Sequence, residues 1–137
     1  MKLCNEVITV FNHRINPEKG WNEYVGTVIR GVSWYSHMVS SVGEHGLNAA
    51  DEVTVRIPED ADFGGKSYVT PKAYKDETIV SGVFTLANGD VIAKGAIEDT
   101  GLNPKAIKER SDESFTILSV TDNRRAPNAP HFRVVGS

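Results

Sequence analysis

The sequence predicts a mostly β protein, a small β-barrel or sandwich of six to seven strands with long loops and one short helix. Three observations predict this fold. Short runs rich in β-branched and aromatic residues recur along the chain, glycine, proline and asparagine residues separate them, and one segment carries the signals of a helix. The 137 residues suffice for one hydrophobic core, so we expect a single domain over residues 1–137.

The first two predicted strands occupy residues 6–11 (EVITVF) and 24–35 (YVGTVIRGVSWY). Both contain many β-branched and aromatic side chains, which favour strands. Gly26 and Gly31 interrupt the second strand and predict bulges or a sharp bend, as a closing barrel requires. Alternation along that strand predicts one face made of Val28, Arg30, Val32 and Trp34.

The third predicted strand, residues 52–58 (EVTVRIP), alternates cleanly between apolar and polar residues. Its inward positions are Val53, Val55 and Ile57, and its outward positions are Thr54 and Arg56. The preceding residues 36–51 (SHMVSSVGEHGLNAAD) have weak periodicity and two glycines, which predict a long irregular loop. The following residues 61–74 predict a glycine turn and one short strand near residues 66–69. In a domain of this size, a long irregular loop is commonly a functional or mobile segment.

Residues 78–94 carry the strongest local signal in the sequence. Two apolar runs, IVSGVFTL and VIAK, enclose Ala87-Asn88-Gly89-Asp90, and Asn-Gly is the favoured pair for a tight hairpin turn. We therefore expect these runs to pair as a hairpin. The next segment, PKAIKER at residues 104–110, predicts the helix, with Asn103 as its N-cap and Pro104 in its first turn.

The last two strands are predicted at residues 114–121 and 132–135, joined by the segment RRAPNAPH. Arg124 and Arg125 open this segment, and guanidinium groups suit both phosphates and carboxylates. Its two prolines restrict the backbone, which lowers the entropy lost on docking. We expect the two arginines to anchor carboxylates of a neighbouring subunit, or to be structural partners of Asp122 and nearby acids.

The composition argues against several classes of function. A net charge of −3 disfavours generic binding to duplex DNA, which depends on clustered Lys and Arg. Trp34, Tyr35 and Phe132 could stack on bases in an OB-type barrel, but their alternating positions are typical of a core. The four histidines are scattered, Cys4 is the single cysteine, and no set of carboxylates or Ser, His and Asp suggests a catalytic centre. We predict no enzyme activity, no metal and no cofactor.

No run of apolar residues approaches the roughly 20 that a membrane helix needs, so we expect no membrane partner.

Four blocks of sequence carry a resemblance to a known family. They are GVSWYS (31–36), residues 46–62 ending in VTVRIPEDAD, GDVIAKG (89–95) and SVTDNRRAPNAPHFRVVG (119–136). Together they resemble a family of small prophage proteins encoded among the head and head–tail connection genes of tailed phages of Gram-positive bacteria. The similarity runs over nearly the whole chain, and the last block is its most specific part.

This resemblance implies a virion structural protein of the head–tail connector, most plausibly a subunit of the head-closure (stopper) ring. It implies a small β-barrel with long loops that is made in the host cytoplasm and assembles as a ring in the virion neck, beneath the portal and its adaptor. The implied partners are portal, adaptor and tail proteins, with at most non-specific contact with passing DNA. The alternatives are a tail terminator, a minor capsid component, or an OB-like domain that binds single-stranded nucleic acid.

No catalytic residue carries over from the resemblance, so the candidate interface residues are inferred from this sequence. Residues 36–51 are the preferred candidate for an arm that adds a strand to a neighbouring sheet. The candidates in the loops are Arg124, Arg125, Asn128, His131, His37, Met38, His45 and Phe63.

Overall fold

Within the described residues, the chain forms eight strands and two short helices and is mostly β, as the sequence predicts. The computed structural model describes residues 5–15, 20, 22–43, 46–76, 82–98, 102–111, 113–125, 127 and 130–137, and for residues 37–43 and 46–51 the backbone alone.

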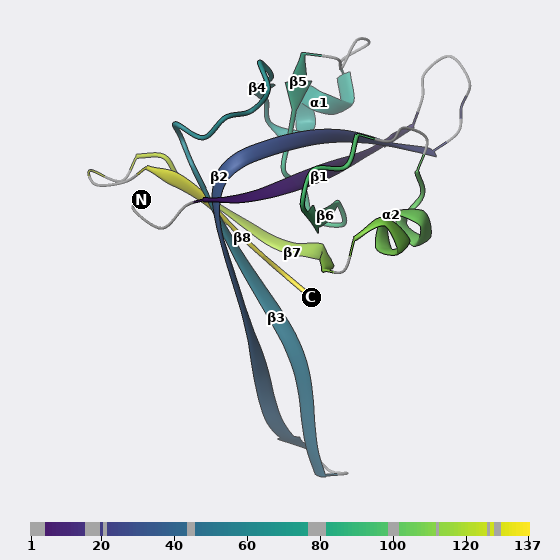
Figure 1. Cartoon of the computed structure of the whole chain (residues 1–137), viewed down its shortest axis with the longest axis vertical. Coiled ribbons are helices and arrows are strands. Elements are labelled where there is room, and N and C mark those ends of the chain that lie inside the picture. Colours follow the sequence, from purple (N-terminus) through teal and green to yellow (C-terminus); the bar gives the residue numbers. More distant parts are fainter. Residues whose placement is uncertain are drawn as a thin grey trace.

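Six antiparallel strands pair in a closed order and form a barrel (Figure 1). Around the barrel they follow the order β1 (Glu6–Ile15), β2 (Asn22–Gly43), β3 (Gly46–Pro58), β8 (His131–Gly136), β7 (Ser114–Asn123) and β6 (Val91–Lys94). Because β1 pairs with both β2 and β6, the sheet closes on itself. The prediction of a small barrel or sandwich is confirmed.

The inner faces of these strands form the main hydrophobic core. Val53, Val55 and Ile57 are all buried, as their alternation predicts. Thr54 and Arg56 occupy the opposite face of the pleat, where Thr54 is also buried and Arg56 is half-buried. The buried residues of the core are Ile8, Val10, Ile29, Val32, Val53, Val55, Ile57, Phe84, Leu86, Ile92, Phe115, Ile117, Phe132 and Val134.

Helix α2 (Pro104–Arg110) covers a second, smaller apolar cluster on the outside of the barrel. Asn103 caps it as predicted, because its side chain accepts a hydrogen bond of 2.8 Å from the backbone N–H of Ala106. Ile107 is fully buried against Phe11 of β1 and Val91 of β6. Phe11 points away from the main core, and α2 shields it from solvent.

Gly31 is the point at which β2 changes its alternation. Its φ of +89° suits glycine, and the register with β1 shifts there, because Val7 pairs with Arg30 while Glu6 pairs with Val32. Arg30 is exposed and Val32 is buried, so the predicted face containing both was wrong. The predicted bulge is confirmed at Gly31, whereas Gly26 pairs with Phe11 without a shift of register.

The predicted irregular loop at residues 36–51 was also wrong. Strands β2 and β3 continue through it in unbroken antiparallel register, from Ser33–Arg56 to Gly43–Gly46. Among the described residues, the part formed by residues 37–43 and 46–52 pairs only with itself, and it projects from the barrel in Figure 1; we call it the ribbon. Weak periodicity misled the prediction because alternation reflects burial of one face, and the ribbon lies outside the barrel.

The hairpin predicted at residues 78–94 was wrong in its pairing. The turn is present, since Gly89 has a φ of +92° and the N–H of Asp90 donates to the carbonyl of Ala87. However, β5 (Val83–Phe84) pairs in parallel with β4 (Ser67–Tyr68), and β6 pairs with β1 and β7. Residues 77–81 lie outside the described residues.

Asn12 explains why the two runs separate. Its Nδ2 donates to the Thr85 carbonyl at 2.6 Å and to Asp90 Oδ2 at 2.9 Å, while its Oδ1 accepts from the Thr85 N–H at 3.1 Å. The Asn12 side chain therefore bonds the N–H and carbonyl of Thr85, which a partner strand in a hairpin would otherwise use. Burial raises the pKa of the Asp90 carboxyl, and the hydrogen bonds from Asn12 and from the His13 N–H oppose this shift.

Helix α1 (Pro71–Asp76) was not predicted. Pro71 begins it and the Thr70 hydroxyl accepts a hydrogen bond from Ala73 N–H, which is an ordinary capping arrangement. Its Tyr74 is buried, and burial raises the pKa of that phenol to about 12.

Candidate functional site

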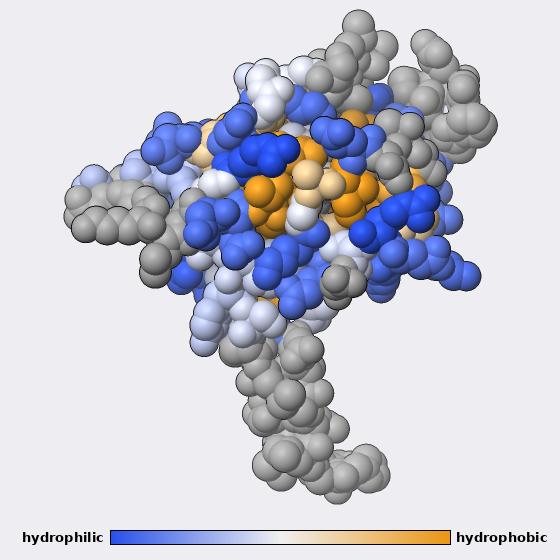
Figure 2. Space-filling view, in the orientation of Figure 1, coloured by the Kyte–Doolittle hydropathy of each residue, from blue (hydrophilic) through white to orange (hydrophobic). Residues whose placement is uncertain are grey.

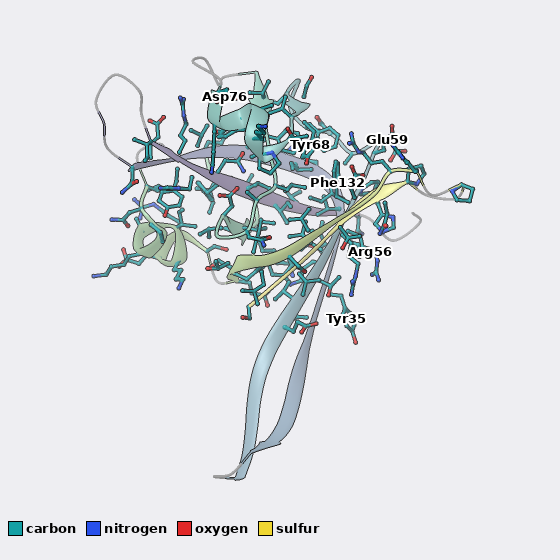
Figure 3. The ribbon with its side chains drawn as sticks, turned by 180° about the vertical axis from the view of Figure 1, so that it is seen from behind. Tyr35, Arg56, Glu59, Tyr68, Asp76 and Phe132 are labelled. Carbon is teal, nitrogen blue, oxygen red and sulfur yellow. The ribbon has the colours of Figure 1, made fainter. Side chains whose placement is uncertain are left out.

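The RRAPNAPH segment connects β7 to β8 at one end of the barrel. Figure 3 shows Phe132, Tyr68 and Glu59 close together at this end. The carbonyl of Pro130 accepts a hydrogen bond of 3.0 Å from the N–H of Glu59, which ties the segment to the chain just after β3. Asn128 lies outside the described residues.

Arg124 is engaged within its own chain. Its Nε and Nη2 each donate to one oxygen of the Asp122 carboxylate at 2.9 Å, and its backbone N–H donates to the same carboxylate at 3.1 Å. This bidentate contact lowers the pKa of Asp122. Of the two roles expected for Arg124, the structure places it as the partner of Asp122.

The guanidinium of Arg124 also covers two aromatic rings. Its central carbon lies 5.1 Å from the ring centre of Tyr68 and 4.8 Å from that of Phe132, within the range of a cation–π contact. Tyr68 and Phe132 lie 4.6 Å apart between ring centres, so the arginine joins β4 to β8. A side chain held on both sides in this way is poorly placed to grip a nucleic acid backbone.

Arg125 is exposed, as Arg124 is. It lines a shallow depression of about 430 Å³ together with Glu59, Asp122 and Arg124. Acidic and basic groups share this depression, so it has no strong net charge of either sign. Arg125 keeps the predicted role of an interface candidate.

The remaining candidates fall into different environments. Phe63 is half-buried and stacks on Phe84 with ring centres 5.2 Å apart, so it packs against the barrel core. His131 begins β8, half-buried, with its Nε2 3.5 Å from Asn123 Nδ2. His37 and Met38 lie on the ribbon, where the backbone pairs them with Glu52 and Asp51, and His45 lies outside the described residues.

A second surface was not foreseen from the sequence. It is the outer face of β2, β3, β8 and β7 at the base of the ribbon, and we call it the outer face. Register places Tyr35, Thr54, Val135 and Ser119 in one row across the four strands, and Ser33, Arg56, Arg133 and Thr121 in the next. Figure 3 shows Tyr35 and Arg56 on the same side of the ribbon base, directed away from the barrel.

Two large apolar side chains on this outer face are exposed. Tyr35 is 57% exposed, and Leu118, at the bulge between Ile117 and Ser119, is 59% exposed. On the side of the molecule seen in Figure 1, Figure 2 shows hydrophilic side chains around a small apolar area. Because side chains alternate along a strand, the packing of Trp34 against the core predicts that Tyr35 points outward. The bulge that exposes Leu118 has no signal in the sequence.

A model of a family of unknown function, DUF6751, matches residues 3–137 of the chain. The chain belongs to DUF6751. Searches of curated proteins and of solved structures gave no match. In this DUF6751 member, no helix within the described residues is long and apolar enough to cross a membrane.

Proposed function

We propose that this chain is a structural subunit of a phage head–tail connector, most plausibly a subunit of the head-closure ring. The observation that carries the proposal is the ribbon, which extends two strands of the barrel into a region where they pair only with each other. A ring needs a contact in which one surface of each subunit meets a different surface of the next. A projecting ribbon on a barrel provides two such surfaces.

The ribbon has the properties of an element that is completed by a partner. An isolated two-stranded hairpin is only marginally stable in water, and a third strand or a packed surface stabilises it. Among the described residues, no strand pairs with the outer edge of either ribbon strand. Association with another subunit would supply the third strand or packed surface that the described residues do not provide.

The sequence of the ribbon supports the same proposal. Exposed edge strands usually carry lysine, proline or other charged residues that prevent pairing with other chains. Residues 37–43 and 46–50 contain no Asp, Glu, Lys, Arg or Pro, although 24% of the whole chain is charged. Edges of this kind suit strand addition by a neighbouring protein.

The alternatives receive less support from the geometry. Single-stranded nucleic acid binding needs exposed aromatic rings beside free basic groups, and the RRAPNAPH end of the barrel does not provide them, because Arg124 is held by Asp122 and covers Tyr68 and Phe132. A structural subunit would act through its surfaces and would require no catalytic centre. A tail terminator or a minor capsid protein would occupy a different place in the particle, so its position distinguishes these options.

The test begins with particles from an induced prophage that encodes this chain. We expect electron microscopy of their necks to show a ring of barrels, and the purified chain to bind a portal–adaptor complex. A variant in which Asn-Gly replaces residues 39–50 should keep a folded barrel, because the ribbon makes no barrel pairing, and should fail to form the ring. Particles that lack the chain in their necks, or a shortened variant that still forms rings, would refute the proposal.

A further inference from the structure

The outer face contains an unusual pair of arginines. Arg56 of β3 and Arg133 of β8 are direct register partners, so two positive side chains lie opposite each other on adjacent strands. Like charges in this position repel and weaken a sheet. Within the described residues neither guanidinium has a carboxylate partner. A fold that keeps this arrangement has positive charge available for a ligand.

The surroundings of the arginine pair favour a protein ligand. Tyr35 lies in the adjacent row and is 57% exposed, and the exposed Leu118 lies beside Val135 at the bulge of β7. Tyrosine and arginine are enriched among the residues that dominate binding energy at protein interfaces. The outer face thus has two arginines on its central strands, β3 and β8, and an exposed apolar side chain on each flanking strand, β2 and β7.

The ribbon has the complementary charge. From residue 31 to residue 55 the chain contains no Lys or Arg, and its charged residues are Glu44, which lies in sequence between the two ribbon strands, and Asp51 and Glu52 at the barrel end of the ribbon, so its uncharged middle is bounded by acids. The ribbon of the same chain starts at the outer face and leads away from it (Figure 1), so paired strands cannot turn back onto it. An acidic ribbon docked on this face would therefore come from another copy.

We infer that the outer face, with Arg56, Arg133, Tyr35 and Leu118, binds the acidic ribbon of a second copy of this chain. The contact is heterologous, since the ribbon of one copy meets the outer face of the next, and it can therefore close a ring. This inference rests on the proposed ring function and names the two surfaces that make its subunit contact. Its test uses this chain alone, so it can fail or succeed independently of where the chain lies in a particle.

Charge reversal on each side gives a sharp test. The face variant carries Arg56→Glu and Arg133→Glu, and the ribbon variant carries Glu44→Lys and Asp51→Lys. Each variant places like charges on both of its surfaces, so we expect its self-association to weaken by about tenfold or more. Sedimentation velocity over a range of protein concentrations measures this change, and added NaCl should weaken wild-type association because salt screens the charges.

The mixture of the two variants separates a lost contact from a lost fold. The acidic ribbon of the face variant complements the basic face of the ribbon variant, and the basic ribbon complements the acidic face. We therefore expect the equimolar mixture to associate about as strongly as wild type. A neutral control, Arg56→Gln with Arg133→Gln, should weaken self-association, and its mixture with the ribbon variant should recover only the contact between the control's acidic ribbon and the ribbon variant's basic face, which joins two copies without closing a ring.

Three results would overturn the inference. They are a wild-type chain that stays monomeric at every concentration tested, single variants that associate as well as wild type, and a mixture that remains dissociated while both variants are folded by circular dichroism.

Discussion

The barrel and the ribbon are made from the same two strands, yet they are stabilised in different ways. Inside the barrel, β3 has a neighbour on each side and buries Val53, Val55 and Ile57 completely or nearly so. Beyond Glu52 the same strand has β2 as its single neighbour among the described residues. The difference teaches that continuous strand pairing does not by itself mean continuous stability, because burial supplies most of the stability of a sheet.

The largest expected effect on stability comes from removing an aromatic side chain from the barrel core. Phe132→Ala deletes a fully packed side chain that also supports Tyr68, so we expect a loss of about 3–5 kcal/mol in the free energy of unfolding. Urea unfolding followed by circular dichroism measures it. Replacing residues 39–50 by Asn-Gly should leave the unfolding midpoint of the barrel nearly unchanged. Equal losses in the two variants would mean that the ribbon stabilises the barrel.

A smaller effect is expected at the polar anchor of β1. Asn12→Ala leaves the Thr85 backbone groups and the Asp90 carboxylate without their buried partner, at a cost of about 3 kcal/mol. Asn22→Ala is the matched control, because it removes an exposed contact with His13 and should cost little. Unfolding midpoints in urea compare the two variants. An Asn12→Ala midpoint equal to that of the control would show that the hydrogen bonds of Asn12 do not stabilise the barrel.

The smallest effect near neutral pH is expected at Tyr74, whose hydroxyl is buried without a partner within the described residues. Tyr74→Phe should therefore keep or slightly raise stability at about pH 8, by at most about 1 kcal/mol. Burial and the charges of Asp90 and Glu23 raise its pKa to about 12, while Arg14 lowers it.

The sign of the pH dependence at Tyr74 follows from this raised pKa. The phenol is neutral in the folded chain above pH 10, where it would ionise once unfolded, so its contribution is complete below pH 10 and is lost as the pH rises through about 12. Between about pH 8 and pH 11, the wild type should lose more stability than Tyr74→Phe. Parallel losses in urea midpoints would show that Tyr74 does not titrate as described.

Much of the barrel follows from local sequence patterns. Alternation in EVTVRIP and the Asn103-Pro104 signal identify β3 and α2 because burial and capping act within a few residues. The Asn88-Gly89 turn was also identified, but its pairing depends on Asn12, more than 70 residues earlier in the chain. Local patterns contain no information about such a distant competitor.

The candidate site was predictable only in part for the same reason. Asp122 and Arg124 are two residues apart, so their contact was open to sequence reasoning. The rings of Tyr68 and Phe132 under Arg124 depend on how β4 packs against the barrel, and the opposition of Arg56 and Arg133 depends on the register of β3 and β8. Register is a property of the closed barrel as a whole, and no single segment determines it.

The length of β2 has a mechanical consequence. Its 22 residues form one strand of roughly 70 Å that begins at the far end of the barrel and ends at the ribbon tip. In β2 the register with β1 shifts at Gly31, a glycine with a φ of +89°. A force applied to the ribbon is therefore transmitted along β2 to Gly31 and to the pairing of β2 with β1. The barrel wall next to Gly31 would bear that load.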